Sequence, residues 1–392
     1  YGLVLLLLIS SPSIFADKAL EKFYSLKNAG LLMLDKDAQV LVSDQAQTAF
    51  IPASTTKLLT AWLALKHWGE DYHFSTSFYL DKKTHTLWIK GSGDPFLVSE
   101  ELQLIALKLK KLGLKQINAI GLDNTFFQTN VLLPGTGKSN NPYDAVPSAL
   151  AANFNTINLK KINGKVVSAE SQTPLTDYAK SFSTQVKGRS LRVNTGPNTA
   201  NAERYFAELL AAFLRKQGVK VKAEIIRGKI DNQPLFYTHR NSRSLAEMIK
   251  GMMKYSTNFL ANQLVLVLSA DAYHRPANAD DVQKYIEQTL IKNFHWKNFT
   301  IKDGAGLSRD NRLSPTQLVD VLKVFKPWKH LLPEIESGIY AKSGTMNGIS
   351  TLAGYIVDDN HWQPFALMMN QAVPYRFRNQ IAVELAKNQA GG

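Results

Sequence analysis

The sequence predicts an α/β (α+β) protein in which helices flank an antiparallel sheet and an α/β module is inserted into the chain. Short apolar runs joined by polar turns lie near both ends, at residues 30–42 and 339–370, as expected for antiparallel hairpins. Strand-like and helix-like segments alternate between them, from residue 70 to residue 237, which indicates a separate α/β unit.

The first sixteen residues have the pattern of a secretory signal peptide. An apolar run at residues 2–9 is followed by Pro12 and ends at the small residue Ala16, as in signal sequences. It begins without Met or a basic segment, so the sequence predicts a leader truncated at its start. The chain contains no cysteine, which excludes a disulfide framework or a lipoprotein attachment site. We expect a periplasmic or otherwise extracytoplasmic protein.

About 375 residues remain after the leader, enough for two domains of about 150 residues or more. The N-terminal hairpin is expected to join the C-terminal strands in one sheet, so that both chain ends belong to one domain. We therefore expect residues 17–69 and 238–392 to form the catalytic domain and residues 70–237 an inserted accessory domain.

Ser54 and Lys57 form the motif around which the site is predicted. They follow Pro52 and precede an apolar segment, where a helix is expected to begin. Residues three apart lie on one face of a helix, so Lys57 can reach the Ser54 hydroxyl. A lysine with a lowered pKa can activate a serine as a nucleophile. Taken alone, the pair is better explained as a capping serine beside an exposed lysine, because residues three apart are ordinary neighbours on helices.

Two later motifs favour the nucleophile interpretation. Ser256 and Asn258 follow a helical segment, and Lys342, Ser343, Gly344 and Thr345 precede the turn pair Asn347-Gly348 and an apolar run. The order S-x-x-K, S-x-N, K-[ST]-G is characteristic of serine β-lactamases and penicillin-binding proteins. Each motif also falls in its expected context of helix start, loop or strand.

Other chemistries lack their motifs. The eight histidines are scattered without H-E-x-x-H spacing, and no G-x-S-x-G elbow occurs, so neither a metal site nor a Ser-His-Asp hydrolase is predicted. Residues 134–139 lack the glycine spacing of a phosphate loop, and we expect no cofactor. The net charge of +14 fits either a solvated basic surface or contact with an anionic wall polymer or lipid headgroups. No dense Lys/Arg run predicts nucleic-acid binding, and at most peripheral membrane association is expected.

The chain resembles the class C low-molecular-mass penicillin-binding proteins, the D-alanyl-D-alanine carboxypeptidase/endopeptidase family of S13-type serine peptidases. Besides the three motifs, the similar stretches are residues 50–54, 90–95, 142–150 and 303–309. The resemblance implies a β-lactamase/transpeptidase-like catalytic domain, peptidoglycan stem peptides as substrates and β-lactams as covalent inhibitors. The chain differs from the family pattern at Ala305 and Asn262, and we expect its inserted region to be shorter than that of the family.

The resemblance also implies a role for each motif residue. Ser54 is expected to be the nucleophile, Lys57 its base and Ser256 the proton relay. The backbone N–H groups of Ser54 and Thr345 are expected to form the oxyanion hole. The residues expected to bind the substrate are Asn258, Lys342, Ser343, Gly344 and Thr345. A non-catalytic wall scaffold or sensor, and a β-lactamase or esterase, remain the alternatives.

Overall fold

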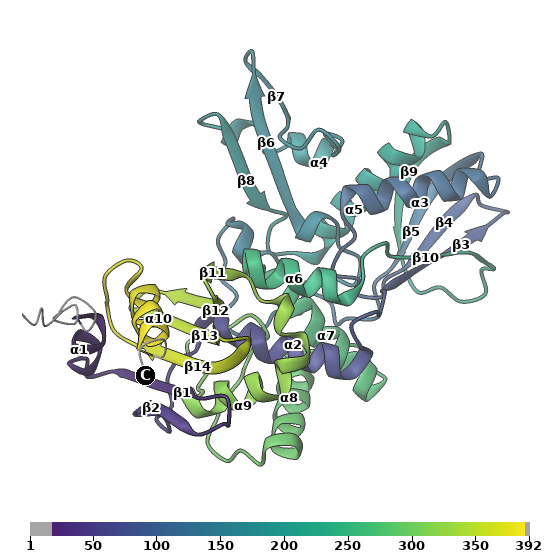
Figure 1. The fold of residues 1–392 in the computed structure, drawn as a ribbon. Coiled ribbons are helices and arrows are strands. Elements are labelled where there is room, and N and C mark those ends of the chain that lie inside the picture. Colours follow the sequence, from purple (N-terminus) through teal and green to yellow (C-terminus); the bar gives the residue numbers. More distant parts are fainter. Residues whose placement is uncertain (1–17, 389–392) are drawn as a thin grey trace, which may run out of the picture.

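The computed structural model describes residues 18–388, and its largest sheet has six antiparallel strands in the order β11-β12-β13-β14-β1-β2 (Figure 1). These strands are β1 (Ala29–Leu34), β2 (Val40–Asp44), β11 (Glu334–Glu336), β12 (Ile339–Met346), β13 (Ile349–Asp358) and β14 (His361–Met369). The N-terminal hairpin joins the C-terminal strands because β1 pairs with β14. The predicted α+β class is confirmed. The predicted signal peptide, residues 1–16, lies outside the described residues.

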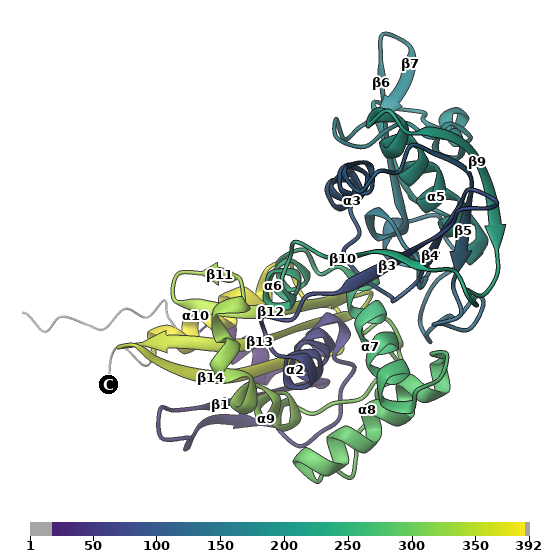
Figure 2. The same ribbon diagram turned by 90° about the vertical axis from the view of Figure 1, so that its right-hand side faces the viewer.

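Helices cover both faces of this sheet (Figure 2). On one face α1 and α10 pack against the apolar side chains of the strands. On the other face α2, α6, α7, α8 and α9 share a larger apolar core. These helices are α1 (Lys18–Tyr24), α2 (Thr56–Trp68), α6 (Leu245–Tyr255), α7 (Asn258–Tyr273), α8 (Ala279–Phe294), α9 (Pro315–Phe325) and α10 (Phe377–Lys387). Helices α2 and α7 are apolar around most of their circumference, as expected for helices buried on all sides.

The middle of the chain builds a second lobe with its own core. Its five-stranded sheet has the order β10-β3-β4-β5-β9, and β4, β5 and β9 run parallel because helices provide the crossovers between them. A smaller sheet has the order β7-β6-β8. The elements are β3 (Ser75–Asp81), β4 (Thr86–Lys90), α3 (Ser99–Lys111), β5 (Gln116–Asp123), β6 (Thr156–Ile162), β7 (Lys165–Ser168), α4 (Asp177–Lys180), β8 (Ser190–Asn194), α5 (Thr199–Lys216), β9 (Lys220–Arg227) and β10 (Leu235–Arg240).

Buried polar contacts fix the junction between the two lobes. Asn241, which lies between β10 and α6, donates a hydrogen bond of 2.9 Å to Asp94, and burial raises the pKa of Asp94 to about 6. Nearby, His239 Nε2 and Glu101 Oε2 lie 2.7 Å apart, and both side chains are buried. A buried polar network of this kind stabilises one relative arrangement of the segments that it joins. We propose the first domain boundary at residues 69/70, as expected from the sequence. The second boundary is proposed after residue 240 and not at 237/238, because β10 pairs with β3 in the sheet of the second lobe along its whole length.

Candidate active site

Ser54 lies in a short 3-10 turn, Ala53–Thr55, that leads directly into α2. Thr55 Oγ1 and Thr351 Oγ1 both donate to the carbonyl oxygen of Pro52, at 2.6 and 2.8 Å, which fixes the turn to β13. Ala53 has a φ of +48°, a left-handed conformation that costs a non-glycine residue about 1–2 kcal/mol. The residues on either side of Ser54 are buried, whereas Ser54 itself is partly exposed. The turn therefore presents the serine to solvent.

Lys57 is fully buried one turn further along α2, and its amine points at the serine. The Nζ atom donates to Ser54 Oγ at 3.0 Å, to Asn258 Oδ1 at 2.8 Å and to the Ala305 carbonyl at 2.7 Å. An ammonium has three donors, and these three acceptors use all of them. When the amine is neutral, the amide and carbonyl oxygens still accept its two N–H bonds. Its lone pair is then directed at the Ser54 hydroxyl.

The electrostatic surroundings favour that neutral form. Burial lowers the pKa of Lys57 well below its ordinary value, and the nearby charge of Lys342 lowers it further, while Asp303 opposes the shift. Desolvation disfavours the charged form of a buried amine. Lys57 is therefore suited to accept a proton from Ser54.

A glycine-rich loop supplies the Ala305 carbonyl. Asn262 Oδ1 accepts hydrogen bonds of 3.0 Å from the backbone N–H groups of Gly304 and Ala305, and buried Asp303 also accepts from the Ala305 N–H. Thr60 from α2 donates to the Gly304 carbonyl at 2.6 Å. Position 305 contributes only its backbone oxygen to Lys57, so alanine keeps this contact. An amide oxygen at position 262 is sufficient to accept the two N–H bonds.

Strand β12 brings the third motif against Ser54. A Cβ atom on Gly344 would lie 2.9 Å from the Ser54 backbone nitrogen and 2.2 Å from Thr351 Oγ1, closer than side-chain atoms approach. Glycine is therefore required for this close packing. Lys342 is buried and Thr345 is exposed, and the Lys342 Nζ atom donates to the Ser343 carbonyl at 2.6 Å.

The second motif lies at the junction of α6 and α7. Ser256 adopts a left-handed conformation with φ of +55°, and Asn258 is the first residue of α7, so the amide is directed at Lys57 from a helix N-terminus. Within residues 18–388, Ser256 makes no hydrogen bond to Ser54 or Lys57. The structure thus joins Ser54, Lys57 and Asn258 directly, whereas Ser256 precedes Asn258 by two residues and is not bonded to Ser54 or Lys57.

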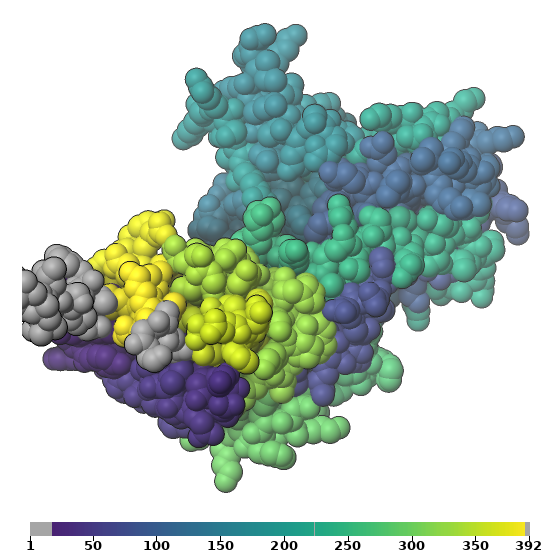
Figure 3. Space-filling view, in the orientation of Figure 1, coloured from purple at the N-terminus to yellow at the C-terminus, as the bar shows by residue number. Residues whose placement is uncertain are grey.

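A pocket of about 680 Å³ opens beside Ser256 and Asn258. Its walls come from both lobes and include Tyr143, Phe154 and Arg192. The indentation between the two lobes is visible on the face shown in Figure 3. The pocket is large enough for several residues of a peptide.

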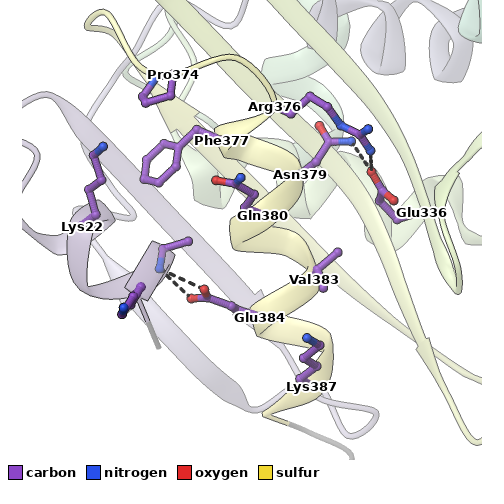
Figure 4. A pocket seen from close by; sticks show the side chains of 12 residues that line it. Lys22, Glu336, Pro374, Arg376, Phe377, Asn379, Gln380, Val383, Glu384 and Lys387 are labelled. Atoms are coloured by element: carbon purple, nitrogen blue, oxygen red, sulfur yellow. Dashed lines mark hydrogen bonds and ion pairs between the residues drawn. The ribbon is translucent and has the colours of Figure 1, made fainter. Parts of the chain in front are cut away.

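A second hollow of about 680 Å³ lies between α1 and α10 (Figure 4), away from these groups. The Glu384 carboxylate there accepts backbone hydrogen bonds from Ala19 and Leu20 at the start of α1. This hollow therefore reflects the docking of α1 on α10. Among residues 18–388 no three His, Asp or Glu side chains gather as metal ligands.

Two contacts at the site have no counterpart in the sequence motifs. One is the Ala305 carbonyl described above. The other is Arg378 of α10, which donates to the Gly344 carbonyl and to Thr345 Oγ1 at 2.6 and 2.7 Å. Every residue has a backbone carbonyl, so the sequence does not show which one is used. A lone arginine in the C-terminal helix is not part of a recognisable motif.

Comparison with known proteins identifies a family and several relatives that this chain resembles. The model of the D-Ala-D-Ala carboxypeptidase 3 (S13) family matches residues 14–185 and 167–335. The D-alanyl-D-alanine carboxypeptidase DacB of Haemophilus influenzae is 24% identical over 397 residues, which cover 84% of this chain and 82% of that protein. The D-alanyl-D-alanine carboxypeptidase of an Actinomadura species is 25% identical over 458 residues, 96% of this chain and 83% of the relative.

Among solved structures, penicillin binding protein 4 from Haemophilus influenzae matches with a TM-score of 0.78 at 21% identity, covering 95% of this chain and 100% of that chain. The predatory endopeptidase Bd3459 of Bdellovibrio bacteriovorus matches with a TM-score of 0.54 at 14% identity, over 92% and 89% of the two chains. At these identities the likeness concerns the fold, and it confirms the expected β-lactamase/transpeptidase-like architecture. The family match covers most of the sequence and confirms the resemblance read from the motifs: this chain belongs to the D-Ala-D-Ala carboxypeptidase 3 (S13) family.

Proposed function

We propose that this protein is a serine-type D-Ala-D-Ala carboxypeptidase that cleaves peptidoglycan stem peptides through an acyl-enzyme on Ser54. The observation that carries the proposal is the 3.0 Å contact between Ser54 Oγ and the buried Lys57 amine, which Asn258 and Ala305 hold in place. A neutral amine fixed in this way is a general base aimed at one hydroxyl. β-Lactams present a similarly reactive carbonyl and acylate the same serine.

In the first step Ser54 Oγ attacks the carbonyl carbon of the D-Ala-D-Ala amide, and Lys57 takes the hydroxyl proton. The negative charge on the tetrahedral oxygen is stabilised by the backbone N–H groups of Ser54 and Thr345. Such a donor is worth about 10²- to 10³-fold in rate. The close approach of Gly344 to the Ser54 nitrogen supports this pairing of the turn with β12.

In the second step the C–N bond breaks and the departing D-alanine amine receives a proton, which Ser256 relays from Lys57. Water then hydrolyses the Ser54 ester and regenerates the enzyme. Asn258 holds the substrate amide, and the Lys342 ammonium and the Ser343 and Thr345 hydroxyls bind the terminal carboxylate, for which a cation and hydroxyl donors are suitable partners.

The test is incubation of the purified protein with a pentapeptide monomer and with a cross-linked muropeptide dimer, followed by mass analysis. Loss of one alanine from the pentapeptide is the expected product. Cleavage of the dimer would add endopeptidase activity. If neither substrate reacts while penicillin still labels Ser54, a wall scaffold or sensor replaces the proposal. Rapid turnover of the penicillin adduct would instead indicate a β-lactamase.

We further propose an extracytoplasmic location, because the substrate lies in the cell wall and residues 1–16 have the pattern of a leader. None of the helices within residues 18–388 combines the length and apolar character that crossing a membrane requires. The net charge of +14 favours contact with anionic wall polymers.

The pH dependence of kcat/KM should be bell-shaped. On the acid side, activity rises as Lys57 loses the proton that prevents it from acting as a base. On the alkaline side, burial and the charge of Arg378 lower the pKa of Lys342 to about 8, so binding of the substrate carboxylate weakens above that pH. A pH profile measured with a D-Ala-D-Ala peptide tests both limbs. Lys342→Gln should lower activity and remove the alkaline limb; an unchanged limb in this variant would contradict the assignment.

A further inference from the structure

Arg378 connects the C-terminal helix to the third motif. It is the second residue of α10, and it is partly buried against β12. One nitrogen, Nη1, donates both to the Gly344 carbonyl at 2.6 Å and to Thr345 Oγ1 at 2.7 Å. Arg378 therefore contacts two residues of the motif that is proposed to bind the substrate carboxylate.

The hydrogen bond from Arg378 restricts the direction in which the Thr345 hydroxyl can donate its proton. A hydroxyl has one donor and can accept through its lone pairs, whereas a guanidinium only donates. Since Arg378 occupies an accepting position, the Thr345 O–H bond has to point elsewhere. Within residues 18–388 it donates to no protein acceptor, and Thr345 is exposed. Its proton is thus available to a ligand at the open side of β12.

The positive charges of Lys342 and Arg378 are not paired with carboxylates of the described residues. Burial lowers the pKa of Lys342 to about 8 and the charge of Arg378 contributes to that shift, while burial also lowers the pKa of Arg378. In the described part of the chain, neither cation forms an ion pair with an Asp or Glu side chain. Buried charges in proteins are usually paired. Two unpaired cations on adjoining elements therefore indicate a site for an anion.

We infer that Arg378 is a specificity-determining residue, which orients the Thr345 hydroxyl and, together with Lys342, makes the site selective for a free C-terminal carboxylate. This inference rests on the proposed carboxypeptidase function and deepens it. Arg378 acts as a positioning residue for Thr345 and as the second positive charge of the carboxylate site. A substrate whose terminal carboxylate is replaced by a carboxamide gains little from either effect.

The test compares an acyl-D-Ala-D-Ala peptide with the same peptide ending in a carboxamide. Arg378→Gln should lower kcat/KM for the acid by about 10- to 100-fold, the usual loss of a charge-assisted hydrogen bond, and should change kcat/KM for the amide by less than about twofold. Arg378→Lys should recover part of the loss because it restores the charge without the fork geometry. The alkaline limb of the pH profile should move upward in Arg378→Gln, since the pKa of Lys342 rises when the neighbouring charge is removed.

Arg376 provides the matched control. Its guanidinium pairs with Glu336 of β11, which Asn379 also contacts, and Figure 4 shows these three side chains converging. Arg376→Gln therefore removes the same charge from the same helix end and should leave both substrates and the pH profile unchanged.

Arg378→Gln could instead lower kcat/KM equally for the acid and the amide peptide and leave the alkaline limb of the pH profile in place. That result would show that Arg378 only supports the packing of α10. Failure of the carboxypeptidase proposal gives a different result, in which wild-type protein cleaves neither peptide. The inference is then tested by the rate at which benzylpenicillin and its methyl ester acylate Ser54. Arg378→Gln should reduce the preference for the free acid; an unchanged preference would overturn the inference.

Discussion

Ser54→Ala is expected to abolish both peptide turnover and covalent labelling by penicillin. Ser54 Oγ is the atom to which the Lys57 amine points, and no other hydroxyl contacts that amine in residues 18–388. Removing the nucleophile of a serine peptidase typically costs about 10⁶-fold in kcat. The measurement is labelling with a fluorescent penicillin, together with release of alanine from a pentapeptide.

The variant should fold normally, because Ser54 is partly exposed and Lys57 keeps its contacts with Asn258 and Ala305. Thermal unfolding establishes this point. Ser25→Ala, at an exposed serine directly after α1, is the control and should label like the wild type. Undiminished labelling of a folded Ser54→Ala protein would exclude Ser54 as the nucleophile.

Lys57→Met is expected to slow acylation by about 10³-fold or more, within the range of 10²–10⁴ that general bases contribute. Methionine has a similar length and suits a buried position, but it cannot accept the Ser54 proton. Its introduction also leaves the oxygens of Ser54, Asn258 and Ala305 without their donor, which costs about 1–3 kcal/mol for each buried group left unpaired. The absence of a buried amine offsets part of that cost.

Stopped-flow acylation by penicillin, with thermal unfolding of the same sample, separates loss of the base from loss of the fold. Lys66→Met serves as the control, because Lys66 lies on the same helix and is exposed; its acylation rate should match that of the wild type. A folded Lys57→Met protein that acylates at the wild-type rate would require another base.

The sequence predicted best those features of the structure that are set by residues close together along the chain. The spacing of Ser54 and Lys57 is three residues, so the 3-10 turn that leads into α2 places the Ser54 Oγ and Lys57 Nζ atoms 3.0 Å apart. The Asn347-Gly348 turn likewise follows from two residues with a strong turn preference, and it connects β12 to β13 as predicted. The helix and strand patterns were sufficient for the α+β class.

The sequence on its own thus determined the three motifs, their order and the local elements that carry them, because periodicity and turn chemistry act over a few residues. Only the tertiary structure decided what surrounds them. The Ala305 carbonyl reaches Lys57 across 248 residues of chain, and Arg378 reaches Gly344 across 34. A carbonyl is common to all residues and an arginine is common on helices, so neither is distinctive in the sequence. Packing of α2, α7, α10 and β12 around one turn selects these groups, buries Lys57 and thereby lowers its pKa.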